Sequence, residues 1–203
     1  MQLPLLRPAR PQLDARFHRL RTEQLGGGAW ISHQSSWLDG DTEVFTALAL
    51  HTRWRDERRP MYDRVVDVPR QVARLPQDGP GHPVLLEASA LLSERFGRPL
   101  TSIGMNHYRD GRDSMGWHAD DDYDAGPHTG VASLSLGAAR RFRLRSRDAQ
   151  RRSLGLDLGP GSLLFMGPGT QSAWQHALPR TARAVGPRLN LTFRHLVADD
   201  VRT

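Results

Sequence analysis

The sequence predicts a mainly β protein with flanking helices, in which a jelly-roll or barrel core follows an N-terminal α/β extension. The chain has 203 residues, enough for one well-packed domain with an appended segment. Its 19 Gly and 14 Pro residues imply many turns, which suit short strands better than long helices. After Pro99 the chain consists of short β-type runs between turn residues, whereas the strongest helical pattern lies before it.

The first part of the chain carries few regular patterns. Residues 1–28 are expected to form a loosely structured lead, because prolines cluster early and Gly26–Gly28 make a flexible break. Residues 37–40 are expected to form a loop. A helix is predicted to begin at Asp41, whose side chain can cap it, and to continue through about Arg55.

A charged segment, 56–60, is expected to be exposed. Residues 61–75 are rich in valine, which indicates an extended, partly edge-like segment. A turn-rich connection over 77–83 leads to the best helical pattern in the chain, residues 84–96, and Gly97 follows as a C-terminal stop. Four apolar residues form the stripe of this helix: Leu85, Ala88, Leu92 and Phe96.

The rest of the chain is predicted to form eight short strands separated by turns. Their expected ranges are Ser102–Tyr108, Gly116–Asp120, Val131–Gly137, Arg141–Arg145, Leu154–Leu158, Ser162–Met166, Ala173–Ala177 and Arg188–His195. We therefore divide the chain into an N-terminal extension with a substrate lid (1–98), a core domain (99–197) and a tail (198–203).

Composition narrows the classes of function. There is no cysteine, which excludes disulfides, zinc ribbons and thiolate chemistry, so that a metal would need His and carboxylate ligands. The chain has no apolar run long enough to span a membrane, and Leu3–Leu6 is too short for a signal peptide, so a cytoplasmic monomer is expected. The net charge is +6, carried by arginine, which fits either a nucleic-acid partner or an arginine-biased proteome.

The polar stretch from Asn106 to Asp122 contains the motif His118-Ala-Asp120. On a strand, residues two apart share a face at a distance of about 7 Å, so the imidazole and the carboxylate would line one wall. With a distant second histidine they would form the two-His, one-carboxylate set that holds Fe(II) and leaves positions open for substrate and O₂. The competing interpretation is an exposed turn with solvated carboxylates.

His176 is the candidate for the second histidine. Alternation along the strand would place it on the same face as Trp174 and Leu178. The competing interpretation is a core imidazole that is satisfied by a backbone carbonyl.

The segment Arg188–Arg194 has the clearest alternation in the chain. Its leucines and phenylalanine would face one way, and a row rich in hydrogen-bond donors, Arg188, Asn190, Thr192 and Arg194, would face the other. The two arginine Cα atoms would lie about 20 Å apart, and inward side chains would leave a gap of roughly 6–8 Å. That gap suits a five-carbon dicarboxylate held by bidentate Arg pairs. A surface strand could carry the same pattern.

Six motifs in this order resemble the AlkB-type Fe(II)/2-oxoglutarate dioxygenases, and most closely the branch that includes the animal DNA and RNA dealkylases. The motifs are Asn106-His-Tyr108, Trp117-His118-Ala-Asp120-Asp-Asp122, the run from Val131 to Phe142, Gly161-Ser-Leu-Leu-Phe-Met166, Trp174-Gln-His176 and Pro187-Arg188-Leu-Asn190-Leu-Thr192-Phe-Arg194. The resemblance covers roughly residues 99–197.

The resemblance implies a double-stranded β-helix and assigns roles to the candidate residues. His118, Asp120 and His176 would bind Fe(II). Six further residues would bind 2-oxoglutarate: Tyr108 and Arg188 at its far carboxylate, Asn106 and Arg194 near the carboxylate beside the keto group, and Asn190 and Thr192 in support. Asp122 would contact the exocyclic amine of a damaged base. The implied activity is oxidative dealkylation of N-alkylated bases in DNA or RNA with O₂, releasing aldehyde, succinate and CO₂.

The sequence departs from the family pattern in the lid. In the relatives, a Pro-Arg segment is followed by an aromatic-rich turn, but the residues after Pro69-Arg70 include no aromatic through Leu75. Arg70 and Tyr62 are our candidates for substrate binding. Trp54 or the guanidinium of Arg74 could replace the missing stacking surface, although Trp54 and Tyr62 could equally be packing residues.

Two other functions remain open at the level of sequence. The same iron enzyme could act on a protein or a small molecule, as the missing aromatic suggests. A non-catalytic basic β-barrel that binds nucleic acid is disfavoured, because all three ligand positions and both arginine positions are present.

Overall fold

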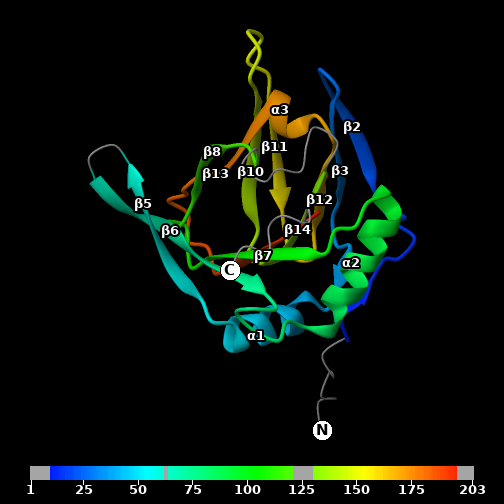
Figure 1. Ribbon diagram of the computed structural model, residues 1–203, viewed down its shortest axis with the longest axis vertical. Helices are drawn as coiled ribbons and strands as arrows, with labels where there is room; N and C mark the ends of the chain where they lie inside the picture. The colour runs from blue at the N-terminus through cyan, green and yellow to red at the C-terminus, as the bar shows by residue number, and fades with distance from the viewer. Residues whose placement is uncertain (1–9, 62–63, 121–129, 196–203) are drawn as a thin grey trace, which may run out of the picture.

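The computed structural model describes residues 10–61, 64–120 and 130–195, which form two main antiparallel sheets with two helices beside them (Figure 1). In spatial order, the eight-stranded sheet contains β2 (Arg21–Gly26), β3 (Ala29–Gln34), β12 (Leu163–Met166), β9 (Val131–Gly137), β14 (Arg188–Arg194), β7 (Ser102–Tyr108), β6 (Arg64–Leu75) and β5 (Arg55–Met61). The four-stranded sheet contains β11 (Ser153–Leu158), β10 (Arg140–Ser146), β13 (Trp174–Leu178) and β8 (Met115–His118).

A further strand pair, β1 (Gln12–Leu13) with β4 (Leu38–Asp39), and three helices complete the described fold. The helices are α1 (Asp41–His51), α2 (Pro83–Phe96) and the single turn α3 (Thr170–Ala173). The two antiparallel sheets, with non-consecutive strands paired, confirm the predicted jelly-roll fold.

Two hydrophobic clusters define the layers. The first packs α1 and α2 against one face of the eight-stranded sheet and includes Val44, Leu92, Leu189, Leu191 and Phe193. The second includes side chains from both sheets, among them Ile31, Val131, Leu144, Met166 and Trp174. Because strand residues alternate between faces, the polar row of β14 points away from the helices and toward the four-stranded sheet.

The two long helices begin and end for identifiable reasons. α2 matches its prediction closely: the Val84 N–H donates to the ring Nδ1 of His82 over 3.2 Å, and Gly97 ends the helix with a φ of 69°. α1 is shorter than predicted. Its N-cap is Gly40 rather than Asp41, whose carboxylate accepts instead from the Gly137 N–H at 3.2 Å.

The predicted loose lead was wrong for its described part, residues 10–28. β1 and β2 lie there, and Gly26–Gly28 form the tight connection between β2 and β3, with φ values of 84°, 63° and 79°. These positive φ values are accessible to glycine, so the three glycines permit a hairpin rather than a flexible break. The predicted loop at 37–40 likewise contains β4.

The charged segment 56–60 belongs to β5, which is the edge strand of the eight-stranded sheet. Edge strands tolerate charge and proline, because one side of the backbone needs no partner. β6 pairs with β5 along most of its length but with β7 only over residues 71–75, and Met61 lies on the edge strand β5, so the partly edge-like character predicted for 61–75 is confirmed.

The eight strands predicted after Pro99 are all present: two match their predicted bounds, and the ends of the others are shifted by at most two residues. One shift matters for the site: β8 ends at His118, so Asp120 follows the strand. The division at residue 98 stays a prediction, and strands from both sides of it join the eight-stranded sheet.

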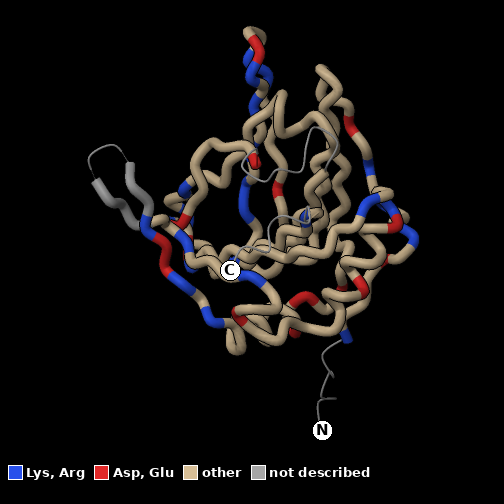
Figure 2. Tube along the Cα trace, viewed as in Figure 1, with Lys and Arg blue, Asp and Glu red and all other residues tan. Residues whose placement is uncertain are grey.

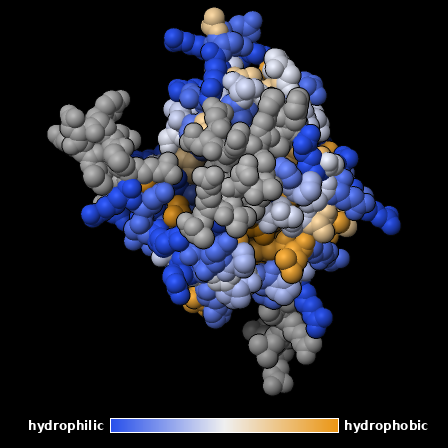
Figure 3. Space-filling view, in the orientation of Figure 1, coloured by the Kyte–Doolittle hydropathy of each residue, from blue (hydrophilic) through white to orange (hydrophobic). Residues whose placement is uncertain are grey.

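The visible face of the molecule is mostly hydrophilic, with scattered apolar patches (Figure 3). None of the helices in the described ranges is both long enough and apolar enough to cross a membrane.

Candidate metal centre and cosubstrate pocket

A cavity between the two sheets brings together all nine residues that the sequence predicts for metal and cosubstrate binding. They are Asn106, Tyr108, His118, Asp120, His176, Arg188, Asn190, Thr192 and Arg194. Five more residues complete the lining: Met115, Ser133, Phe142, Met166 and Leu178. The predicted residues come from β7, β8, β13 and β14, except for Asp120, which follows β8; β7 neighbours β14 in one sheet and β8 neighbours β13 in the other, which makes this convergence possible.

The two histidines face each other across neighbouring strands. His118 on β8 is directly opposite His176 on β13, and their ring centres are 4.1 Å apart. Asp120 lies between them: its Oδ1 is 3.8 Å from Nε2 of His118, and its Oδ2 is 3.8 Å from Nε2 of His176. One ligand atom from each residue lies within 4.8 Å of the others, which is close enough for the three to share one ion.

The tautomer of His118 suits metal binding. Its Nδ1 lies 2.9 Å from the carbonyl oxygen of Gly116, which can only accept, so Nδ1 carries the proton. The lone pair is therefore on Nε2, the atom that faces Asp120. A backbone acceptor behind a ligating imidazole is a common way to fix its orientation. His176 is buried, and Phe142 stacks on its ring at 5.4 Å.

Asp120 is held in its ionised form. Burial alone would raise the pKa of its carboxyl group, but the positive charge and hydrogen bond of Arg194, together with the charges of the His176 and His118 rings in their protonated form, outweigh this and lower the pKa. Nη2 of Arg194 donates to Oδ1 of Asp120 over 2.9 Å. The site therefore offers a metal ion two imidazole nitrogens and one carboxylate.

Gln171 on α3 is a residue that sequence reasoning missed. Its Oε1 accepts from the backbone N–H of Asp120 over 3.1 Å, and its Nε2 lies 3.8 Å from the sulfur of Met166, which lines the cavity. Asp120 lies beyond the end of β8, so this bond fixes a backbone position that the sheet does not hold. The sequence signal is weak, because Gln171 is 51 residues from Asp120.

The surroundings of Arg188 fit its predicted contact with an anion in the cavity. Its side chain is fully buried, and burial lowers its pKa to about 10. Nη2 donates to Ser135 Oγ over 2.7 Å and to Asn190 Oδ1 over 3.0 Å, but the buried Nε has no hydrogen-bond partner. In the described part of the chain no carboxylate pairs with this guanidinium. A buried guanidinium with a donor that has no acceptor is well suited to bind the carboxylate of a ligand.

The rest of the row forms a hydrogen-bonded network. Asn190 accepts from Ser133 Oγ over 2.6 Å and donates to Thr192 Oγ1 over 3.0 Å. Tyr108 is buried, with the guanidinium of Arg188 5.4 Å from its ring centre, and burial raises the pKa of its hydroxyl group. Arg188 and Arg194 occupy opposite ends of β14, as expected for two separate carboxylate contacts.

The structure describes only some of the residues predicted to bind the substrate, and those that it describes do not line the cavity as the metal and cosubstrate residues do. Arg70 does not line the cavity, and its Nε donates to Asn106 Oδ1 over 2.7 Å, which places Arg70 beside a residue predicted to bind the cosubstrate. Tyr62 and Asp122 lie outside the described residues. Trp54 is partly buried and packs on His107 at 5.1 Å, so it resembles a packing residue more than a stacking surface.

Comparison with known proteins places this site in a class. Residues 28–194 match the model of the 2OG-Fe(II) oxygenase superfamily, and the chain belongs to that superfamily. Membership implies Fe(II), 2-oxoglutarate and O₂ as cofactor and cosubstrates, and the His-Asp-His set and the unpaired Nε of buried Arg188 fit them.

Within that superfamily, the chain is similar to AlkB-type proteins. It is 38% identical over 125 residues to a Mus musculus protein named DNA oxidative demethylase ALKBH2, covering 58% of this chain and 52% of that protein. It is 36% identical over 126 residues to a Bos taurus alpha-ketoglutarate-dependent dioxygenase alkB homolog 3, covering 58% and 44%. The chain thus spans about half the length of these relatives.

A solved structure described as that of OsALKBH1 has the same fold. Its TM-score is 0.60 at 20% identity, over 85% of this chain and 100% of that one. At this identity the likeness supports the fold only.

Proposed function

We propose that this chain catalyses oxidative dealkylation of N-alkylated bases in nucleic acid, with DNA as the first candidate. The observation that carries the proposal is the convergence of His118, Asp120 and His176 beside the buried guanidinium of Arg188. The names of the AlkB-type relatives support nucleic acid as the substrate class.

A bound Fe(II) ion would supply the oxidative chemistry, in which O₂ and 2-oxoglutarate are consumed, the carbon attached to a base nitrogen becomes hydroxylated, and aldehyde, succinate, CO₂ and the unmodified base are released. The chain would hold the ion through Nε2 of His118, Nε2 of His176 and the carboxylate of Asp120.

The protein's own contribution is to bind and orient. Arg188, with Tyr108 beside it, would bind the far carboxylate of 2-oxoglutarate, and Arg194, with Asn106, would bind the carboxylate near the metal. The bidentate geometry of guanidinium and carboxylate would fix the direction of the cosubstrate. Apolar side chains, including Phe142 and Met166, line the same cavity and would limit the access of water.

The substrate would enter as a single base. A base in a duplex is inaccessible to a cavity between two sheets, so it would have to be flipped out or presented in a single strand. The net charge of +6 supports attraction to the phosphate backbone. Asp122 stays the predicted contact to the base amine, Tyr62 stays a predicted substrate contact, and Arg70 would act through Asn106.

The test is a mass-spectrometric demethylation assay on methylated single- and double-stranded oligonucleotides with Fe(II), 2-oxoglutarate and ascorbate. Loss of the methyl mass, matched by succinate formation, is expected for the full chain. The Asp120→Ala variant should show neither product. Succinate formation without any demethylation of DNA or RNA would contradict the nucleic-acid substrate.

A second candidate function is hydroxylation of a protein side chain or a small molecule by the same centre. It is favoured by one observation: residues 69–75 contain no aromatic, and Trp54 is engaged with His107. Succinate formation that responds to a peptide or metabolite pool but not to oligonucleotides would support it.

We also propose that the chain acts as a monomer in the cytoplasm. Light scattering of the purified chain and imaging of a tagged copy would test these two points.

A further inference from the structure

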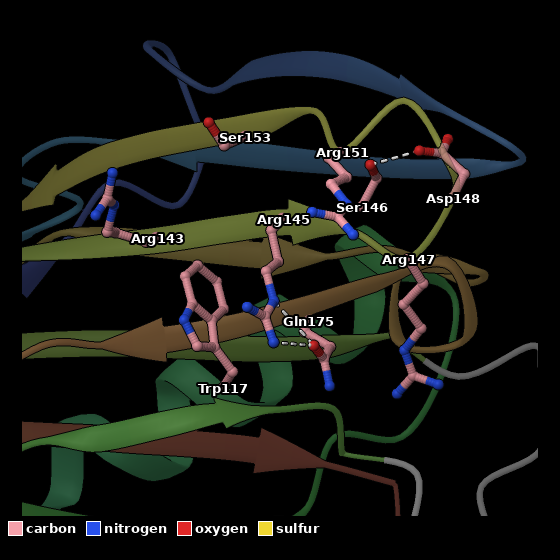
Figure 4. Close-up of a pocket in the computed structure, with 9 residues that line it drawn as sticks. All are labelled: Trp117, Arg143, Arg145, Ser146, Arg147, Asp148, Arg151, Ser153 and Gln175. Carbon is pink, nitrogen blue, oxygen red and sulfur yellow. Dashed lines mark hydrogen bonds between the residues drawn. The ribbon is translucent and has the colours of Figure 1, made fainter.

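The outer face of the four-stranded sheet carries a basic groove that the proposed chemistry does not use. The groove has a volume of about 740 Å³, and its lining includes Trp117, Arg143, Arg145, Arg147, Arg151 and Gln175 (Figure 4). Trp117 and Gln175 immediately precede His118 and His176, which line the cavity. Since successive residues of a strand point to opposite faces, the groove and the cavity lie on opposite sides of one sheet.

The sequence of β10 explains the positive charge of the groove. Buried and exposed residues alternate along this strand, with Phe142 and Leu144 inside and Arg143 and Arg145 outside. Residues two apart on a strand are about 7 Å apart, which is comparable to the distance between successive phosphates of an extended nucleic-acid strand. Figure 2 shows basic residues continuing along the projecting β10–β11 hairpin.

Arg145 and Trp117 form a flat platform in this groove. Cζ of Arg145 lies 4.3 Å from the ring centre of Trp117, and Nε and Nη2 of Arg145 donate to Gln175 Oε1 over 3.0 and 2.7 Å. The side chain of Trp117 is 37% exposed, one of few large hydrophobic residues exposed in the described ranges. The guanidinium plane is therefore held in place against an aromatic ring at the surface.

Two arginines of the groove, Arg143 and Arg145, lack an acidic partner among the described residues. In the described part of the chain, no carboxylate lies within ion-pair distance of Arg143 or Arg145. The groove residue Asp148 accepts instead from Ser146 Oγ and Arg152 Nη2, each over 2.7 Å. By contrast, Arg141, the next outward residue of β10, pairs with Asp157 over 2.8 Å.

We infer that this groove binds a single-stranded nucleic-acid segment outside the catalytic cavity. Arg143 and its basic neighbours would contact successive phosphates, and an unpaired base would stack on the platform of Trp117 and Arg145. An acidic peptide would match the charge but would make no use of the planar surface. The inference shares with the proposed function only the premise that the chain meets nucleic acid. It requires neither an alkylated base nor iron.

Binding of an undamaged, fluorescein-labelled oligothymidine, followed by anisotropy at several salt concentrations, tests the arginines. The double variant Arg143→Ala/Arg145→Ala should bind about tenfold more weakly. The slope of log K against log salt should fall by about 1.4, or roughly 0.7 for each lost phosphate contact. The single variants Arg143→Ala and Arg145→Ala are each matched by the control Arg141→Ala, which removes one charge from the same face of β10. An equal effect of single-site losses at 141, 143 and 145 would overturn the inference.

The platform is tested separately. Trp117→Ala should weaken binding about tenfold, whereas Trp117→Phe, which keeps a ring, should retain most of the affinity. Equal competition by polyglutamate and by unlabelled oligothymidine would overturn the inference in favour of an acidic protein partner.

Binding of oligothymidine in the groove and demethylation in the cavity can be measured independently. Demethylation by the chain, with unchanged oligothymidine binding by the arginine double variant, would overturn the groove alone. The predicted binding pattern without any demethylation would support the groove and contradict the proposed substrate.

Discussion

Arg188 has surroundings that favour ligand binding over a contribution to stability. Its guanidinium is fully buried, contacts Ser135 and Asn190, and leaves Nε without a partner. Removing a charge from water is unfavourable unless acceptors replace the lost hydration. The protein alone supplies too few of them, and a carboxylate from the cosubstrate would supply the rest.

We therefore expect Arg188→Met to separate stability from binding. An apolar side chain of similar length removes the desolvation penalty, so the melting temperature should stay the same or rise. The affinity for 2-oxoglutarate should fall at least about 30-fold, since loss of a buried charge contact costs roughly 2–5 kcal/mol. Thermal unfolding and calorimetric titration measure the two quantities, and Arg141→Met at the surface is the control. A large loss of stability with normal cosubstrate affinity would show that Arg188 is structural.

At the scale of elements, the metal centre depends on how a single helical turn meets a strand end. β8 stops at His118, and α3 provides Gln171 to hold the backbone of Asp120 two residues later. Asp120 therefore takes its position from a contact between elements and not from the sheet hydrogen bonds.

Gln171→Leu should weaken Fe(II) binding by about fivefold, the effect of losing one net hydrogen bond of about 1 kcal/mol. The apparent KM for 2-oxoglutarate should change much less, because the row on β14 is untouched. Ser172→Ala on the same turn is the control. Equal losses in Fe(II) and 2-oxoglutarate affinity would indicate general disruption of the site.

Asp14 makes hydrogen bonds that stabilise the N-terminal strands. Its carboxylate accepts from Gln34 Nε2 and the backbone N–H of His18, each over 2.8 Å, and contacts the His18 ring at 2.7 Å. Burial would raise the pKa of Asp14, but these hydrogen bonds outweigh it and lower the pKa to about 2.

Asp14→Ala should therefore destabilise the chain at neutral pH, and the difference should depend on acidity. A depressed carboxyl pKa stabilises the fold above the ordinary value of 3.8, and this contribution is lost as the pH falls toward about 2. Urea unfolding of both proteins between pH 7 and the acid limit of folding measures the gap. A gap that stays constant over this range would contradict the role assigned to the ionised carboxylate.

At the scale of the whole molecule, β14 separates two environments. Leu189, Leu191 and Phe193 join the core beneath the helices, while the intervening residues line the cavity. One strand thus contributes to stability on one face and to binding on the other.

Leu191→Ala should reduce the free energy of unfolding by about 2–5 kcal/mol, because it leaves a cavity beneath α1 and α2. The matched control is Leu50→Ala: Leu50 is 72% exposed on α1, and its loss should change stability by less than about 0.5 kcal/mol. Chemical denaturation measures both. Similar effects at the two positions would contradict the layer assignment.

The same strand shows what could be predicted from sequence. Strict alternation from Arg188 to Arg194 identified the apolar and the polar face of β14. The apolar stripe and the stop at Gly97 identified α2. Both signals are local, so the sequence alone reveals them. β2 was missed because it is mostly exposed and polar, without an alternating pattern. The contact of Arg70 with Asn106 was not predicted, because only the pairing of β6 with β7 brings the two residues together.

Arg194 would link the binding of the metal ion to the binding of 2-oxoglutarate. Its guanidinium contacts the same carboxylate that would ligate the ion, and it is also the proposed partner of the anion beside it. Occupancy at either position alters the electrostatic environment of the other, so the two affinities are thermodynamically coupled. By reciprocity, bound iron changes the affinity for 2-oxoglutarate by the same factor as bound 2-oxoglutarate changes the affinity for iron.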